Sequence, residues 1–285
     1  MESSMSIHLS KRLETICLMV TPGNRVLDVG TDHAHVPIRL LQDGICERTL
    51  GFDVADGPLE IAKTNLELAG LTDRCEIRKS DGLTKYQKGE ADTLIIAGMG
   101  GMLLRSLLER DIDKVLDFRE LILSPHREPW QVREFLYQEN IGIRRECLVE
   151  EDGKFYPVIR AVPGEQMVCP DWEQLSQRLQ GTDLAGEAAA NRERVLPLLQ
   201  DQNFRRYAET TYGPALLADY FAGGADALDR YLMQTLAKDI GVYESLLQKE
   251  AQSSHAGNRM EELRGEIGMV QALVFLHHEL VSKER

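Results

Sequence analysis

Apolar residues in the first half of the chain follow two alternating patterns. Short runs rich in Val, Leu and Ile, such as Val26–Val29, predict buried strands, and the apolar residues between them recur at every third or fourth position, which predicts helices. The predicted strands are 25–29, 49–53, 74–79, 92–97 and 120–124, and the predicted helices are about 8–20, 37–43, 57–69, 101–110 and 129–139. This alternation predicts an α/β domain with a mostly parallel sheet.

The segment 143–162 breaks the alternation, because two apolar-rich runs follow one another without a helix. They are joined through Glu151-Asp-Gly-Lys154, and Asp-Gly between such runs is a strong signal for an antiparallel hairpin. Five strands joined by helices and closed by a terminal antiparallel hairpin are the pattern of a class I methyltransferase sheet, which is Rossmann-like. A dinucleotide-dependent dehydrogenase would continue with further parallel strands.

The pattern becomes purely helical near Val162-Pro163-Gly164. Two long apolar seams follow, Leu228, Leu232, Leu236, Ile240, Tyr243 and Leu247 in the first, and Met260, Leu263, Ile267, Val270 and Val274 in the second. With the polar segment Ser253–Asn258 as a loop between them, they predict an antiparallel helical hairpin that resembles a coiled coil. We therefore expect a methyltransferase-like domain over 1–163 and an α-helical domain over 164–285.

Composition limits the class of protein. No run approaches the roughly 18 apolar residues of a membrane span, and no basic-then-apolar leader opens the chain. The five cysteines are odd in number and scattered, which favours reduced thiols in the cytoplasm over disulfides or a zinc site. A net charge of −13 means that any contact with RNA must use a local basic patch against an unfavourable overall field.

The first strand, loop and helix carry the most informative pattern. The run Val26-Leu-Asp-Val-Gly30 leads into Thr31-Asp-His-Ala34 without the second and third glycines of a dinucleotide-binding loop. Those glycines let backbone N–H groups approach a pyrophosphate, so dinucleotide binding is disfavoured. An Asp-x-Gly turn with further acids suits a cationic ligand without phosphate, such as S-adenosylmethionine.

Further candidate ligand-binding residues follow the next three strands. Asp53 ends the second strand, where a carboxylate can accept hydrogen bonds from both ribose hydroxyls, and Asp81 could accept from the adenine amino group. Asp53 could instead be a solvated loop acid, and Asp81 could belong to a simple Asp-Gly turn. Glycines after the fourth strand allow close approach of the backbone. The predicted cofactor-binding set is Asp28, Gly30, Asp32, His33, Asp53, Asp81, Gly82, Ala97, Gly98 and Met99.

Two other groups of residues invite functional interpretation. The pair His33 and His35 could suggest a metal, but Asp28 and Asp32 are the only acids nearby and suit the cofactor better, so we expect no metal. Basic residues cluster around the fifth strand and the hairpin, at Arg127, Arg133, Arg144, Arg145, Lys154 and Arg160. They could follow the phosphates of an RNA, or they could be solvated, salt-bridged surface charge.

Taken in order, these motifs resemble the bacterial tRNA (adenine-22-N1)-methyltransferase family. The motifs are Gly30-Thr-Asp-His-Ala-His-Val-Pro37, Gly57-Pro58, Asp81-Gly-Leu83, Ile96-Ala-Gly-Met-Gly-Gly101, Leu121-Ile-Leu-Ser-Pro125 and Glu151-Asp-Gly-Lys-Phe-Tyr156. The resemblance covers about 8–162 and, more loosely, the helical tail with Tyr212-Gly-Pro214. It implies S-adenosylmethionine as cofactor, tRNA as partner and a C-terminal coiled-coil domain.

The chain departs from the family pattern at several positions. Thr31, His35 and Val36 are mild changes near the cofactor, whereas Ser124 and His126 stand where amides are usual. The usual acid after the Tyr156 position is replaced by Pro157. The last three changes lie where the acceptor base would bind.

Methylation of adenine N1 needs no strong base, because the neutral ring already offers a lone pair at N1. Asp32, His33 and His126 are the candidate catalytic residues, since each could contact N1 or N6 of the target. Two alternatives remain: a methyltransferase for another RNA position or a small molecule, and a cofactor-binding adaptor without catalysis.

Overall fold

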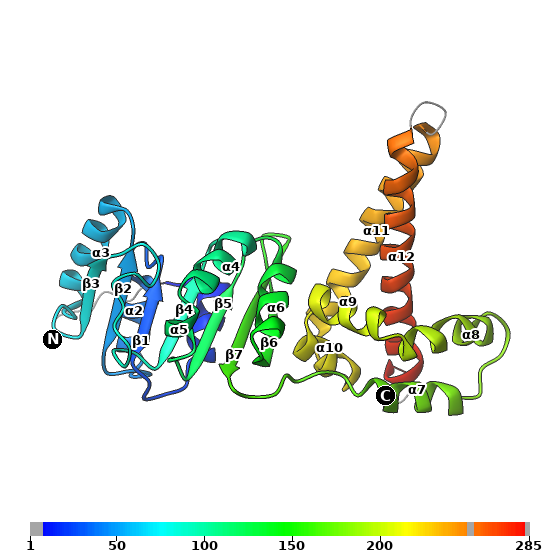
Figure 1. Cartoon of the computed structure of the whole chain (residues 1–285), viewed down its shortest axis with the longest axis horizontal. Helices are drawn as coiled ribbons and strands as arrows, with labels where there is room; N and C mark the ends of the chain where they lie inside the picture. Colours follow the sequence, from blue (N-terminus) through cyan, green and yellow to red (C-terminus); the bar gives the residue numbers. More distant parts are fainter. Residues whose placement is uncertain (1–7, 250–253, 283–285) are drawn as a thin grey trace. The chain divides into compact units, whose positions relative to one another are not determined.

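The structure is a computed structural model that describes residues 8–249 and 254–282. It divides into two compact units, Met1–Val168 and Cys169–Arg285 (Figure 1). The first unit is an α/β domain and the second is helical. Each unit is described below by itself.

The first unit is built on a seven-stranded sheet in the order β3-β2-β1-β4-β5-β7-β6. The strands are β1 (Val26–Val29), β2 (Thr49–Asp53), β3 (Cys75–Lys79), β4 (Thr93–Ala97), β5 (Glu120–Ser124), β6 (Ile141–Glu151) and β7 (Lys154–Pro163). The pairs among β1 to β5 are parallel, and β7 runs antiparallel to both β5 and β6. The predicted class I methyltransferase sheet with a terminal antiparallel hairpin is confirmed.

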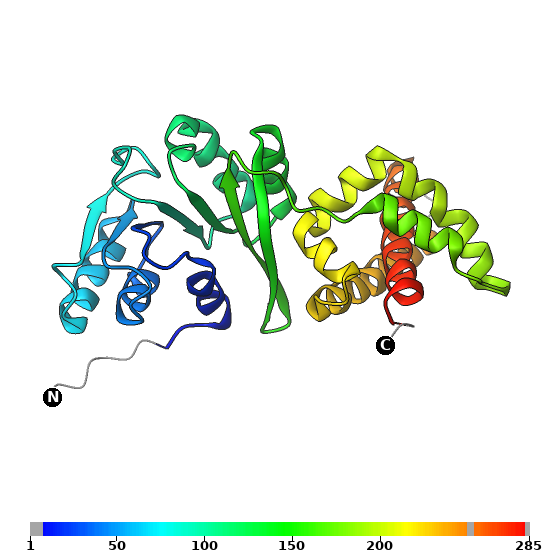
Figure 2. The same cartoon turned by 90° about the horizontal axis from the view of Figure 1, so that it is seen from below.

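Helices cover both faces of this sheet. They are α1 (Lys11–Met19), α2 (His35–Gln42), α3 (Asp56–Ala69), α4 (Gly101–Arg110), α5 (Ile112–Val115) and α6 (Pro129–Gln138). Figure 2 shows α1, α2 and α3 on one face and α4 and α6 on the other. Every residue of β1 and of β5 is buried, as expected for central strands covered on both sides.

The hairpin of β6 and β7 is longer than the sequence predicts, because β6 begins at Ile141. Its turn uses Asp152 and Gly153, which both have positive φ angles of 50° and 70°. These are the angles that a tight two-residue hairpin turn requires. The register shifts between Ile143 and Arg145, so that Arg144 is the extra residue of a β-bulge.

The second unit contains α7 (Trp172–Gly181), α8 (Gly186–Gln200), α9 (Gln202–Tyr212), α10 (Pro214–Phe221), α11 (Asp226–Lys249) and α12 (Ser254–Leu280). The two long helices α11 and α12 pack against each other, as their apolar seams predict. Burial is complete at Leu228 and Leu232 and is lost toward the far end of α11, where Leu247 is 46% exposed. None of the helices in the described part of the chain is both long and apolar enough to cross a membrane.

The prediction of a loop at Ser253–Asn258 is wrong for most of this segment. Residue 253 lies outside the described residues, but α12 already begins at Ser254. Ser, His and Asn are poor loop markers at this position, because helix propensity differs by well under 1 kcal/mol among such residues.

Candidate active site

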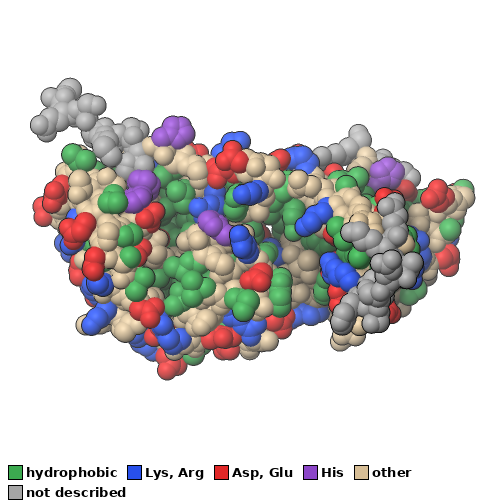
Figure 3. Space-filling model, turned by 90° about the horizontal axis from the view of Figure 1, so that it is seen from above, with side chains coloured by type: hydrophobic (Ala, Val, Ile, Leu, Met, Phe, Trp, Pro, Cys, Tyr) green, Lys and Arg blue, Asp and Glu red, His purple; other side chains and the backbone are tan. Residues whose placement is uncertain are grey.

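A cavity of about 430 Å³ lies at the carboxyl edge of the sheet, where β1, β2 and β4 end. It is lined by Arg12, Leu13, Asp28, Gly30, Thr31, Asp32, His33, His35, Val36, Asp53, Ala97, Gly98, Met99 and His126. Figure 3 looks onto this edge, where basic, acidic and histidine side chains are interspersed. Eight of the ten predicted cofactor-binding residues and all three candidate catalytic residues line this one cavity.

The loop after β1 forms one wall of the cavity. The backbone N–H groups of Gly30 and Thr31 both donate to the carbonyl of Phe52 in β2, at 2.8 and 3.0 Å, so the loop turns sharply across the neighbouring strand. Gly30 has a φ of +74°, and a Cβ there would lie 2.7 Å from the Met99 side chain. Glycine is therefore favoured at position 30 by its backbone angle, whereas the end of the flexible Met99 side chain could move away from a Cβ.

Asp28 is the most deeply buried acid of the cavity, with 5% of its surface exposed. Burial raises the pKa of this carboxyl to about 7, and the neighbouring carboxylates Asp53 and Asp32 add to the rise. A buried acid without a basic partner gains from a positively charged ligand. Asp28 therefore marks the inner end of the cavity as a site for a cation.

Asp53 connects the β2 end to the β1 loop. One carboxylate oxygen accepts from the backbone N–H of Asp32 at 3.3 Å, and the other accepts from the N–H of Ala55 at 3.0 Å. Each oxygen keeps further lone pairs for a ligand. The acid is thus held at the cavity wall in a fixed orientation.

The loops after β4 and β5 are joined through their backbones. Gly98 donates to Ser124, His126 donates to Met99 at 2.8 Å, and Gly101 donates to Arg127 at 2.8 Å. A Cβ at Gly101 would lie 2.2 Å from the carbonyl oxygen of Glu128, so only glycine allows this approach. The glycine-rich segment after β4 therefore fixes the position of His126.

His126 stands at the outer part of the cavity beside Tyr156 of β7, with 5.4 Å between the ring centroids. Burial lowers the pKa of this histidine, and the positive charges of Arg12 and Arg127 lower it further. The imidazole is therefore neutral near pH 7 and can accept a hydrogen bond. Ser124, the other departure from the family pattern, is fully buried and is not among the described residues lining the cavity.

Asp81 and Gly82 are the two predicted cofactor-binding residues that do not line this cavity. The Asp81 carboxylate lies 3.1 Å from Arg110 of α4, which also donates to the Asp81 carbonyl oxygen at 2.8 Å. A cofactor adenine would have to share this carboxylate with Arg110. Its role in binding remains a prediction.

Five lining residues were missed by the sequence interpretation: Arg12, Leu13, Thr31, His35 and Val36. Thr31, His35 and Val36 belong to the Gly30–Pro37 motif and could have been included. Arg12 and Leu13 gave no such signal, because α1 reaches the cavity only through its packing. The N-terminus of α1 is held by a hydrogen bond from the Lys11 N–H to Glu151 of β6, at 2.9 Å.

The basic residues around β5 and the hairpin separate into two groups. Arg133, predicted to contact RNA, is 1% exposed and its Nε donates to Glu146 at 2.8 Å, so this prediction is wrong. Arg160 pairs with the buried Glu120 at 2.7 Å, and Arg144 pairs with Glu165 at 2.9 Å. The exposed members without a described ion pair are Arg127, Arg145 and Lys154.

Within the described residues, no group of three or more His, Cys, Asp or Glu side chains is placed to hold a metal ion. His33 and His35 have their ring centroids 5.5 Å apart, and His33 lies 3.6 Å from Asp32.

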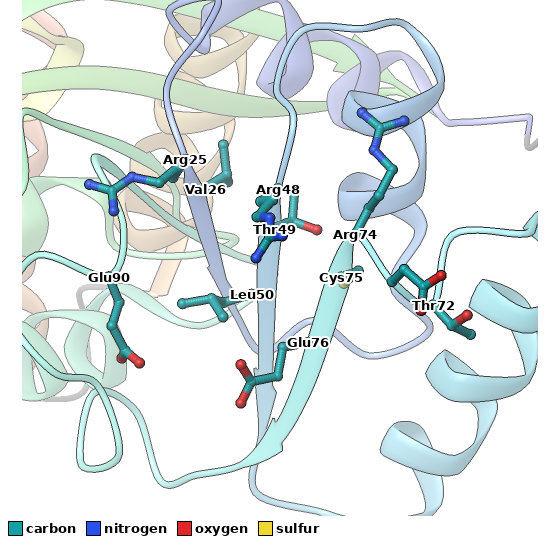
Figure 4. Close-up of a pocket in the computed structure, with 11 residues that line it drawn as sticks. Arg25, Val26, Arg48, Thr49, Leu50, Thr72, Arg74, Cys75, Glu76 and Glu90 are labelled. Atoms are coloured by element: carbon teal, nitrogen blue, oxygen red, sulfur yellow. The ribbon is translucent and has the colours of Figure 1, made fainter.

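A second cavity of about 430 Å³ lies at the opposite edge of the sheet. Figure 4 shows Arg25, Arg48 and Arg74, which directly precede β1, β2 and β3. Arg25 pairs with Asp92 at 2.9 Å, and Arg74 donates to three backbone carbonyl groups. These two arginines hold the strand beginnings together, whereas Arg48 is exposed.

The fold and the carboxyl-edge site define a class I methyltransferase domain. Residues 9–159 match the family of proteins described as "Methyltransferase domain". The tRNA (adenine(22)-N(1))-methyltransferase of Bacillus subtilis is 37% identical over 185 residues, which are 65% of this chain and 78% of that protein. The chain therefore belongs to the tRNA (adenine(22)-N1)-methyltransferase family.

Solved structures extend the similarity to the whole chain. The tRNA methyltransferase TrmK of B. subtilis has a TM-score of 0.72 at 27% identity, covering 94% of this chain and 100% of that chain. TrmK of M. capricolum, solved with S-adenosyl-homocysteine, has a TM-score of 0.69 at 20% identity, covering 94% of this chain and 98% of that chain. At that identity the second comparison supports the fold alone.

Proposed function

We propose that this protein transfers a methyl group from S-adenosylmethionine to N1 of adenine 22 in tRNA. The observation that carries the proposal is the acidic cavity at the carboxyl edge of the sheet, in a chain of the tRNA (adenine(22)-N1)-methyltransferase family. We infer a cytoplasmic location from the proposed tRNA substrate.

The residues of the cavity fit S-adenosylmethionine. Asp28, Asp32 and Asp53 give the wall a negative charge that suits the sulfonium and ammonium groups of this cofactor and repels the pyrophosphate of a dinucleotide. Asp53 would accept hydrogen bonds from the ribose hydroxyls, as the position at the end of β2 suggests. Gly98, with a φ of +83°, would bring the backbone of the β4 loop against the methionine part.

When bound, S-adenosylmethionine supplies a methyl group on a positively charged sulfur. The adenine N1 lone pair would bond to the methyl carbon as the carbon–sulfur bond breaks, with the electron pair of that bond staying on sulfur. The positive charge then resides on the methylated base. The protein's main contribution is to hold the target base in line with the carbon–sulfur bond, outside its stack in the RNA.

His126 is the lining side chain best suited to the target base. Its neutral imidazole can accept a hydrogen bond from the N6 amino group, and that group becomes a stronger donor as positive charge develops on the ring. Such a contact strengthens in the transition state and so accelerates the reaction. Asp32 and His33 remain candidates for the same role, and the Asp32 carboxylate would also favour a cationic product.

The exposed residues Arg127, Arg145 and Lys154 would contact phosphates near the target. We assign the helical unit to binding the body of the RNA without a part in the chemistry. A chain ending at Val168 should keep its cofactor affinity and methylate tRNA poorly. Full activity of the shortened chain on tRNA would contradict this assignment.

The proposal is tested with purified protein, methyl-labelled S-adenosylmethionine and two unmodified tRNA transcripts, one with adenine and one with guanine at position 22. Label should enter the first transcript only. Equal labelling of both transcripts would indicate another RNA position. In a second experiment a cell extract replaces the transcripts, and label only in its small-molecule fraction would indicate another acceptor. Cofactor binding with no transfer at all would indicate an adaptor.

A further inference from the structure

Among the described arginines, Arg12 stands out because it has a buried guanidinium nitrogen, Nη1, that makes no hydrogen bond. Arg74 and Arg160, in contrast, each donate to two or more oxygens. A buried donor without an acceptor costs about 1–3 kcal/mol. Because Arg12 also lines the cavity, its guanidinium is a candidate for binding a ligand there.

Two contacts constrain the position of Arg12. Lys11, the preceding residue, is held to Glu151 through its backbone N–H. The guanidinium carbon of Arg12 lies 5.7 Å from the centre of the Tyr156 ring. Burial lowers the pKa of Arg12, although the nearby Glu151 and Tyr156 act in the opposite direction. The side chain is therefore a preorganised cation at the outer end of the cavity.

The charges of the cavity indicate what Arg12 binds. Among the described residues that line it, Arg12 is the only lysine or arginine, whereas Asp28, Asp32 and Asp53 are acids. S-adenosylmethionine matches this distribution, because it has two cationic groups and a single anionic group, the α-carboxylate. That carboxylate would be repelled anywhere else in an acidic cavity. We propose that Arg12 binds the α-carboxylate of S-adenosylmethionine and thereby orients its methionine part.

The competing role for Arg12 is a contact with the target nucleotide. A cation beside the target base would oppose the positive charge that develops on adenine during methylation, which disfavours a contact with the ring. A contact with an RNA phosphate is the remaining alternative. The carboxylate is favoured over the phosphate because Arg12 lines the same cavity as Asp28, Asp53 and Gly98, which the proposed function assigns to the cofactor.

The inference rests on the use of S-adenosylmethionine, and it is tested by binding rather than by turnover. Calorimetry compares S-adenosylmethionine with decarboxylated S-adenosylmethionine, which keeps both cationic groups and lacks only the carboxylate. Arg12→Ala should weaken binding of the first ligand by about ten- to a hundredfold, the loss of a charge-assisted pair of hydrogen bonds. Binding of the decarboxylated ligand should stay unchanged or become tighter.

Two further variants keep the result interpretable. Arg12→Lys retains the charge and should lose less affinity than Arg12→Ala, even if the alanine variant unfolds at a lower temperature. Lys11→Ala changes the exposed neighbour, whose described contact uses only the backbone, and should bind both ligands like the wild type.

Each outcome distinguishes the assignment from the proposed function. Equal losses for both ligands would overturn the carboxylate assignment even if the enzyme methylates tRNA. Weaker tRNA binding with unchanged affinity for S-adenosylmethionine would also overturn it and would make Arg12 a phosphate contact. A selective loss in a protein that fails to methylate tRNA would support the assignment and contradict the proposed function.

Discussion

The two cavities at opposite edges of the sheet have the same volume, about 430 Å³, and differ in how their charges are used. At the amino edge, Arg25 and Arg74 already donate to Asp92 and to backbone carbonyl groups. At the carboxyl edge, the structure describes no basic partner for the buried Asp28 and no hydrogen bond for the Arg12 Nη1 atom. Volume does not separate the two cavities, whereas the pairing of their buried charges does. Arg48 at the amino edge is exposed to solvent, while Asp28 and the Arg12 Nη1 atom at the carboxyl edge are buried. We expect buried charges that are paired within the protein to stabilise its fold, and those that are not paired to bind a ligand.

The largest effect is expected for Arg133→Ala, because this change removes a buried ion pair with Glu146. Breaking a buried ion pair from one side costs about 3–5 kcal/mol of the free energy of unfolding. Urea unfolding measures it, with Arg145→Ala as the matched control, since Arg145 is exposed and should change the stability little. A stable Arg133→Ala protein with a reduced salt dependence of RNA binding would instead indicate that Arg133 contacts RNA.

A smaller effect, on binding instead of folding, is expected for Asp53→Ala. Loss of the contact between this carboxylate and the ribose hydroxyls should weaken binding of S-adenosylmethionine by about 1.5–3 kcal/mol, or tenfold and more. Calorimetry checks this value, and Arg48→Ala at the amino-edge cavity is the control that should bind normally. Equal losses of cofactor affinity in Asp53→Ala and Arg48→Ala would contradict the assignment of the cofactor to the carboxyl-edge cavity. Tight binding of NAD to the wild type would contradict the identity of the cofactor.

Asp28 should make cofactor binding depend on pH. The pKa of this carboxyl is raised to about 7 in the folded protein, so its ionised form is disfavoured there and its contribution to stability declines as pH rises from about 4 to about 7. A cationic ligand favours the ionised form. Affinity for S-adenosylmethionine should therefore rise with pH up to about 7, by at most about tenfold per unit, and binding should release protons.

Calorimetry in two buffers of different ionisation enthalpy measures this release. Asp28→Asn cannot ionise and should bind the cofactor more weakly, with the proton release near pH 7 reduced. If the wild type binds the cofactor equally well at pH 5.5 and pH 7.5, its affinity does not depend on the ionisation of Asp28.

The smallest effect concerns the exposed basic residues. Arg145 is exposed, whereas the neighbouring Arg144 already pairs with Glu165 at 2.9 Å. Each phosphate contact contributes about one unit to the slope of log affinity against log salt concentration. Arg145→Ala should reduce that slope by about one unit in filter binding to tRNA, and Arg144→Ala should reduce it less. Unchanged slopes for both variants would assign these arginines to ordinary surface charge.

Much of the fold and of the site could be predicted because the signals are local. The Gly30 loop, Asp53 and the glycines after β4 each follow a strand, and the carboxyl ends of parallel strands meet at one edge. The Asp152-Gly153 turn follows from the backbone angles that these residues tolerate. The sequence did not indicate where a long side chain meets a distant partner, as Arg133 does with Glu146 and Arg110 does with Asp81. The first pairing makes the predicted RNA contact of Arg133 wrong, and the role of Asp81 in cofactor binding stays a prediction.

The sequence by itself determined the succession of strands and helices along the chain, the antiparallel final hairpin and the acids gathered at one edge of the sheet. These follow from the apolar spacing and turn residues, which act over a few neighbouring positions. Only the tertiary structure decided which charges are paired. It buried Arg133, joined Asp81 to Arg110 and brought Arg12 from α1 to the cavity. Pairing depends on distances of about 3 Å between groups far apart in the chain and on the removal of these groups from water. The local spacing of apolar residues predicts neither of them.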